Sequence, residues 1–127
     1  MKENCILELA KIQHHLAHAY QERIRGNKAE NIEQAIACLK NALKIYLEEK
    51  CILEWGEIQD HLAYAYRQRI RGNKAENMEA VITCLRMTLM VYTPKNFPKK
   101  WTELQNNLAH AYQEEYTRWK QNQNREY

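Results

Sequence analysis

The sequence repeats itself at a fixed spacing of 46 residues. Residues 12–46 return as residues 58–92, and 22 of the 35 aligned positions are identical. A third, partial copy follows, because ELQNNLAHAYQ at 103–113 aligns with KIQHHLAHAYQ at 11–21 and with EIQDHLAYAYR at 57–67. Repeats of this length are typical of arrays in which each unit leaves an apolar face for its neighbour to cover. The 127-residue chain therefore contains about two and a half units.

Each unit has the apolar spacing of two consecutive helices. In the second unit, one stripe consists of Trp55, Ile58, Leu62, Tyr66 and Ile70, and the next consists of Met78, Ile82, Leu85, Leu89 and Tyr92. Steps of three and four residues place such side chains on one face of a helix. The sequence predicts an all-α, helical-hairpin solenoid of about five helices in a single domain. Its parts are repeat 1 at about 5–50, repeat 2 at about 51–96, a partial repeat with a C-terminal capping helix at about 97–120, and a polar tail at 121–127.

Glycine and asparagine predict the ends of these helices. The first helix of each unit is predicted to end at 25–26 and at 71–72, where glycine suits the left-handed conformation that closes a helix. Asn31 and Asn77 are predicted to cap the second helices by accepting a backbone N–H bond. Gln34, three residues after Asn31, is the expected capping-box partner in the first unit.

The two connections between units differ. Residues 93–98 contain two prolines, which predicts a loop. The matching segment 47–54 contains neither proline nor glycine, so two structures remain open. A turn here gives an ordinary stack and is the preferred interpretation. Without the turn, one helix would run from about Asn31 to Arg71, and each unit would need cover from a second chain, as in a domain-swapped dimer.

The sequence argues against several classes of protein. No apolar segment approaches the roughly 18 residues of a membrane helix, and the N-terminus lacks the pattern of a signal peptide, so a cytoplasmic protein is expected. The four cysteines follow the repeat and form no C-x-x-C motif, which favours reduced packing residues. The chain has no serine and no glycine-rich phosphate loop. Cys38 and Cys84 lie beside core leucines and are not expected to be nucleophiles. We therefore expect neither an enzyme nor a cofactor.

Two other kinds of site receive weak support. His14 and His18 share a helical face, with Glu22 one turn further on. A metal site also needs oriented partners and a closed geometry, and the other copies have Asp60 with Tyr64 and Asn106 with His110 at these positions, so no metal site is assigned. Six cations in Arg-Ile-Arg-Gly-Asn-Lys segments at 23–28 and 69–74 form a basic ridge that suits phosphates. Glutamates follow each segment and the net charge is only +3, so nucleic acid is not the expected partner.

A motif in the first helices carries a family resemblance. Leu-Ala-x-x-Tyr occurs at 16–20, 62–66 and 108–112, and second helices read Ala-x-x-x-Leu-x-x-Ala-Leu at 35–43 or a close variant at 81–89. Over about residues 5 to 116 this pattern resembles the tetratricopeptide repeat. The period of 46 is longer than the usual 34 or so. The chain is most similar to a long-period variant whose units carry Gln-Asn-Asn-Leu and Arg-Ile-Arg-Gly motifs.

The resemblance implies a protein that binds a partner protein or peptide in a concave groove lined by first helices. The residues that it assigns to partner binding are His14, His18, Asp60, Tyr64, Arg67, Asn106, Asn107 and His110. The alternative is a self-associating structural module, a domain-swapped homodimer in which the uninterrupted segment from Tyr46 to Trp55 drives dimerisation. Some association is expected in either case, because the outer face of the first helix has no evident cover.

Overall fold

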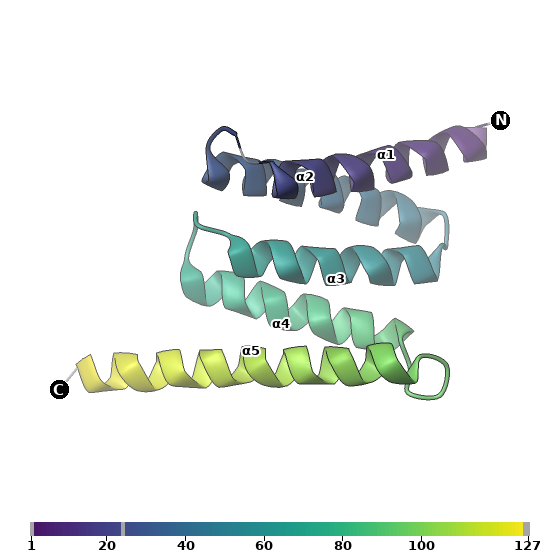
Figure 1. Ribbon diagram of the computed structural model, residues 1–127. Coiled ribbons are helices and arrows are strands. Elements are labelled where there is room, and N and C mark those ends of the chain that lie inside the picture. The colour runs from purple at the N-terminus through teal and green to yellow at the C-terminus, as the bar shows by residue number, and fades with distance from the viewer. Residues whose placement is uncertain (1, 24, 126–127) are drawn as a thin grey trace.

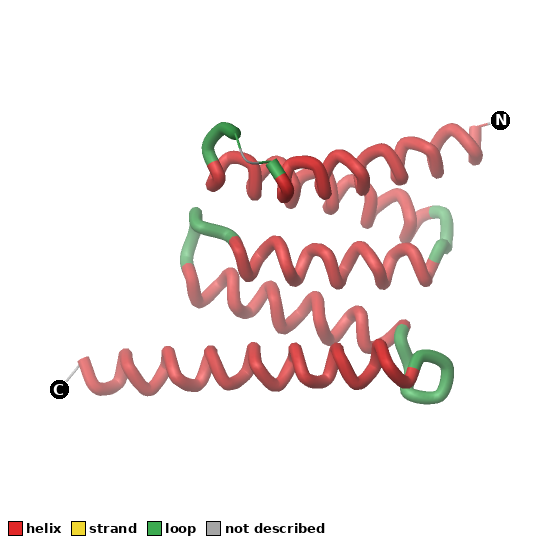
Figure 2. The backbone as a smooth tube through the Cα atoms, in the orientation of Figure 1, coloured by secondary structure: helices red, strands yellow, loops and turns green. Residues whose placement is uncertain are grey.

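The computed structural model describes residues 2–23 and 25–125, which form five helices and, within these residues, no strand (Figure 2). The helices are α1 (Lys2–Glu22), α2 (Lys28–Glu48), α3 (Ile52–Gln68), α4 (Lys74–Val91) and α5 (Pro98–Arg125). Each helix packs against the next one in the chain. The predicted all-α fold of helical hairpins is confirmed.

The helices form two layers. Figure 1 shows α1, α3 and α5 on one side and α2 and α4 behind them, with the two ends of the described chain at opposite ends of the stack. The hairpins are α1 with α2 and α3 with α4, and α5 packs against α4. None of the helices in the described residues is long and apolar enough to cross a membrane.

The second helices begin earlier than the sequence predicts. Asn27 and Asn73 are the N-caps: the Oδ1 of Asn27 accepts from the N–H of Glu30 at 3.1 Å, and the Oδ1 of Asn73 accepts from the N–H of Ala75 at 2.8 Å. The assignment of Asn31 and Asn77 as caps is wrong, because the Lys-Ala-Glu residues before them are helical. Both are buried one turn inside the helix. Their amide nitrogens donate to the carbonyl oxygens of residues 25 and 71 at 3.2 and 3.0 Å and so hold the preceding connector.

Gln34 and the two connector glycines also differ from expectation. The side-chain nitrogen of Gln34 donates to a carboxylate oxygen of Glu30 at 3.3 Å, within the helix. Gly26 and Gly72 have φ of 89° and 84°, the left-handed conformation expected of them. The preceding helices nevertheless end at Glu22 and Gln68, so these glycines lie inside the connectors and do not end the helices.

The chain turns between α2 and α3. The N–H of Cys51 donates to the carbonyl oxygen of Tyr46 at 2.8 Å, and the N–H of Lys50 donates to that of Leu47 at 3.1 Å. With Lys50 at a φ of 61°, these two bonds form the Schellman motif that commonly ends helices. The continuous helix from Asn31 to Arg71, and with it the domain swap that it would require, is therefore not formed.

The last connection agrees with the sequence. Residues 92–97 form the loop between α4 and α5, in which the N–H of Phe97 donates to the carbonyl oxygen of Thr93 at 2.8 Å. The aromatic rings of Tyr92 and Phe97 pack edge to face with centroids 5.0 Å apart. Helix α5 continues to Arg125, so most of the predicted polar tail belongs to the helix.

Apolar residues that are identical in the first two units are buried in α3 but exposed to solvent in α1. Ile58 and Leu62 are 0% and 2% exposed, whereas their counterparts 46 residues earlier, Ile12 and Leu16, are 59% and 42% exposed. The difference arises because α3 lies between α2 and α4, whereas α1 packs chiefly against α2. Leu108 on α5 is half-buried against the core. Leu16 is thus placed on its helix as Leu62 is but lacks the neighbour that buries Leu62.

Candidate functional site

A groove of about 540 Å³ crosses the layer formed by α1, α3 and α5. Its walls come from these three helices, and Ala63 with two residues of α4, Val81 and Leu85, adds apolar surface. The residues that line it are His18, Gln21, Glu22, Asp60, His61, Ala63, Tyr64, Arg67, Val81, Leu85, Glu103 and Asn107. The groove therefore combines polar walls with an apolar base.

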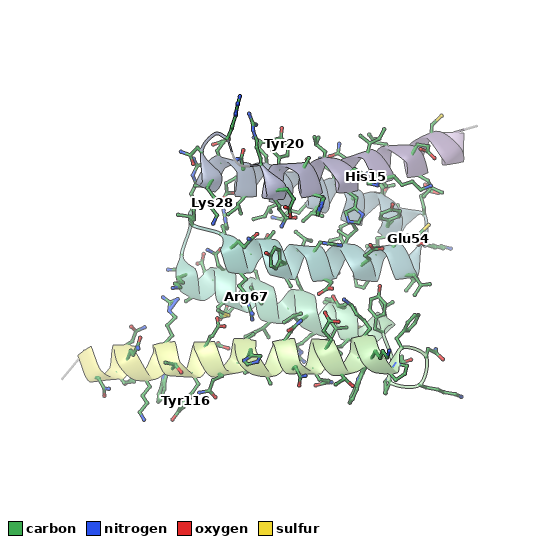
Figure 3. The ribbon with its side chains drawn as sticks, viewed as in Figure 1. His15, Tyr20, Lys28, Glu54, Arg67 and Tyr116 are labelled. Carbon is green, nitrogen blue, oxygen red and sulfur yellow. The ribbon has the colours of Figure 1, made fainter. Side chains whose placement is uncertain are left out.

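Tyr64 is the most exposed large apolar side chain of the groove. Its side chain is 57% exposed, and its hydroxyl accepts a hydrogen bond from the side-chain nitrogen of Gln68 at 3.3 Å. Arg67 lies one turn along α3 (Figure 3) and reaches Glu114 on α5, with Nη2 3.9 Å from the carboxylate. An amphipathic ring and a cation thus stand side by side on α3, where a ligand can contact both.

An ion pair joins α3 to α5 at the groove wall. The Nζ of Lys100 donates to the Oδ2 of Asp60 at 2.7 Å and lies 3.8 Å from the Oε1 of Glu103. Partial burial disfavours the charged form of Lys100. The hydrogen bond and charge of Asp60 outweigh this effect, so the pKa of the Lys100 ammonium is raised above its ordinary value. The charge of Asp60 is therefore balanced within the protein.

The structure brings together five of the eight residues that the resemblance assigns to partner binding. His18, Asp60, Tyr64, Arg67 and Asn107 line the groove. The other three do not line it: His14 packs against His61 beside the groove, and Asn106 and His110 are exposed on α5. Sequence reasoning missed Val81 and Leu85, because it assigned the whole groove to first helices.

A cluster of three potential metal ligands lies where α1 meets α3. The rings of His14 and His61 have centroids 4.7 Å apart, and the Nε2 of His61 lies 3.8 Å from the Oε1 of Glu57. One ligand atom from each residue falls within 4.8 Å of the others. Burial and the charge of His61 lower the pKa of His14 below its ordinary value. His14 is thus grouped with residues of α3, and not with His18 and Glu22 as the helical spacing suggested.

The basic segment of the second unit contacts the first unit. Arg69 pairs with Glu33 at 2.6 Å, and Arg71 pairs with Glu30 at 3.1 Å. The glutamates that follow each basic segment in the sequence offer ion pairs within one unit, whereas these two pairs cross between hairpins. Because two of the six cations of the ridge are held by carboxylates, the arginine motif contributes to stacking in the second unit.

The cysteines lie where the repeat places them. Cys38 and Cys84 are buried, Cys51 is half-buried and Cys5 is exposed. Burial raises the pKa of the Cys84 thiol to about 11, so this thiol is protonated at neutral pH and is a poor nucleophile.

The chain matches no protein-family model, no curated protein and no solved structure. The groove, the histidine cluster and the uncovered face of α1 are therefore the features from which function is inferred.

Proposed function

We propose that this protein is a non-enzymatic interaction module of tetratricopeptide-repeat type, which binds a short segment of a partner protein in the groove along α1, α3 and α5. The observation that carries the proposal is the exposed Tyr64 between polar walls and an apolar base of Val81 and Leu85. The Leu-Ala-x-x-Tyr motif and the repeated hairpins support it from the sequence.

The groove has the size and composition of a ligand site. Ligand clefts in proteins commonly enclose about 300–1,000 Å³ and combine apolar surface with a few polar groups that fix orientation. The volume here is about 540 Å³. Aromatic and arginine side chains carry a large share of binding energy at interfaces, which is the role that we assign to Tyr64 and Arg67.

The charges of the groove favour a particular kind of segment. Asp60 is balanced by Lys100 and Arg67 approaches Glu114, whereas Glu22 takes part in no ion pair within the described residues. A segment with one apolar side chain for the base and a basic residue near Glu22 fits this arrangement. Peptide recognition would then depend on an apolar anchor, with charge setting its orientation.

The test is selection of displayed peptides on the wild-type chain, followed by affinity measurements on variants. Tyr64→Ala is expected to weaken the selected peptides by about 30-fold or more, since an interface hot spot is worth about 2 kcal/mol. Tyr116→Ala is the matched control, because Tyr116 is exposed to a similar extent, 55%, and lies on α5 outside the groove (Figure 3). Enrichment of no peptide, or equal affinity of Tyr64→Ala and wild type, would contradict the proposal.

Self-association is a second candidate function, favoured by the apolar face that α1 leaves open. The exposed residues of this face are Ile6, Leu9, Ile12 and Leu16. Side chains of this size gain about 1.5–3 kcal/mol each when fully buried. The measurement is molar mass in solution as a function of concentration. Wild type is expected to dimerise and Ile12→Glu to remain monomeric, whereas a monomeric wild type at high micromolar concentration would exclude this function.

A further inference from the structure

The histidine cluster joins two hairpins at one side of the groove. His14 is on α1, and Glu57 and His61 are one turn apart on α3. The side chains of Glu57 and His61 remain 53% and 38% exposed, so they can change rotamer without disturbing the core. An ion bound here would contact both hairpins.

The three side chains form a donor set that divalent transition ions prefer. Two imidazoles and one carboxylate, with a fourth position left for water or another ligand, are a common arrangement around zinc. Zinc bonds of about 2.0–2.2 Å place tetrahedral ligand atoms roughly 3.3 Å apart. The ligand atoms here lie within 4.8 Å of one another, and two of them are 3.8 Å apart. Rotamer changes that move the ligand atoms by an ångström or so would therefore bring them to the spacing of a tetrahedral zinc site.

At the next junction in the stack, between α3 and α5, a lysine balances the negative charge of the equivalent residues. Residues 60, 103 and 107, which are Asp, Glu and Asn, correspond to residues 14, 57 and 61 by the 46-residue shift. There the ammonium of Lys100 lies 2.7 Å from Asp60 and 3.8 Å from Glu103. The junction between α3 and α5 thus contains a cation of its own.

The junction between α1 and α3 has an acid where that cation would be. The counterpart of Lys100, 46 residues earlier, is Glu54, which lies near the start of α3 (Figure 3). Glu54, Glu57 and His61 are spaced by three and four residues and so share one face of the helix. The cluster at this junction therefore gains a second carboxylate nearby and has no lysine at the matching position, which favours a cation from solution.

We infer that His14, Glu57 and His61 form a binding site for a divalent transition ion of the zinc class, which links the first hairpin to the second. The site borders the groove, because His61 is one of the residues that line it. Glu54 strengthens the site by its negative charge. The site shares His61 with the groove, whereas Tyr64 and Arg67 do not belong to it.

The test uses the full chain without a histidine tag, titrated with Zn²⁺ in a calorimeter and with Co²⁺ followed by visible absorption. One ion per chain is expected, with the absorption of a tetrahedral or five-coordinate Co²⁺ site. His14→Gln and His61→Gln should each weaken binding at least tenfold or so, because even outer-shell partners of a metal site are worth about 10- to 100-fold. His110→Gln is the control, since His110 is exposed on α5 outside the cluster, and it should bind as wild type does.

A second variant tests the comparison between the two junctions without removing a ligand. Glu54→Lys places an ammonium where the next junction has Lys100, and Glu54 is exposed, so the fold should be retained. This variant should lose Zn²⁺ affinity at least tenfold, whereas Glu54→Gln should lose less. Absence of Zn²⁺ binding to wild type below about 100 μM, or equal affinity of His14→Gln, His61→Gln and wild type, would overturn the inference.

Discussion

Arg69 and Glu33 form a two-point ion pair between the two full hairpins. The Nε of Arg69 donates to one carboxylate oxygen at 2.6 Å, and Nη2 donates to the other at 3.1 Å. The two side chains are only 28% and 24% exposed. Paired contacts between a planar guanidinium and a carboxylate are stronger than single contacts at an exposed surface. The pair therefore stabilises the packing of the connector after α3 against α2.

A double-mutant cycle with Arg69→Ala and Glu33→Ala measures this contribution. We expect a coupling free energy of about 1–2 kcal/mol in urea unfolding, because the pair is part-buried and doubly hydrogen-bonded. The control cycle uses Arg23→Ala and Glu79→Ala. Arg23 is the counterpart of Arg69 in the first unit, Glu79 is the counterpart of Glu33 in the second, and the two form no ion pair within the described residues. A coupling no larger than that of the control would show that the pair contributes nothing to the stack.

The second prediction compares the exposed face of α1 with the equivalent buried face of α3. Ile58→Ala is expected to lower the free energy of unfolding by about 2–5 kcal/mol, since it removes a fully buried side chain. Ile12→Ala, at the equivalent position of α1, should cost less than about 1 kcal/mol, because Ile12 is 59% exposed. Urea unfolding at low protein concentration measures both. Equal losses would mean that another chain covers α1 in solution, and the loss at Ile12 would then depend on concentration.

Most of the fold was predictable because the repeat and the helical period agree with each other. The stripe from Met78 to Tyr92 is buried or half-buried as expected, and the division into hairpins follows the 46-residue shift. The ends of the helices were harder to predict. Two asparagines compete for each cap, Asn27 with Asn31 in the first unit, and both can accept a backbone N–H bond. Only the structure shows that the first of each pair is the cap.

The candidate site was predictable in part, for a different reason. Residues three and four apart on one helix are easily found, which is why His14 and His18 attract attention in the sequence. The pairing of His14 with His61 depends on how α1 and α3 pack, and a single sequence contains no direct signal of contacts between repeats. The change from Lys100 to Glu54 at matching positions was visible in the sequence, but its meaning required the ion pair between Lys100 and Asp60.

The turn at Lys50 explains why the sequence left two structures open, and it gives a third prediction. Lysine occupies a left-handed position, φ 61°, that usually contains glycine, at a cost of roughly 1 kcal/mol. Lys50→Gly is therefore expected to raise the free energy of unfolding by about 0.5–1 kcal/mol. A continuous helix would give the opposite sign, because glycine inside a helix costs about 1 kcal/mol. Glu48→Gly, within the last turn of α2, is the control and should be destabilising.

The buried thiol of Cys84 predicts a loss of stability at alkaline pH. Burial raises its pKa from 9.0 to about 11, so between these values the folded chain retains a proton that the unfolded chain releases. The stabilisation is complete below pH 9 and is lost as the pH rises through about 11, at a slope of about 1.4 kcal/mol per pH unit and a total of roughly 2–3 kcal/mol. Cys84→Ala should make the decline between pH 9 and 10 less steep, as measured by urea unfolding at each pH. Part of the decline should remain, because burial also raises the pKa of the Cys38 thiol. Cys5→Ala, at an exposed thiol, is the control and should leave the decline unchanged. Parallel declines in Cys84→Ala and wild type would assign the alkaline loss to other groups, such as Cys38, Tyr46 and Tyr92, whose pKa values burial also raises.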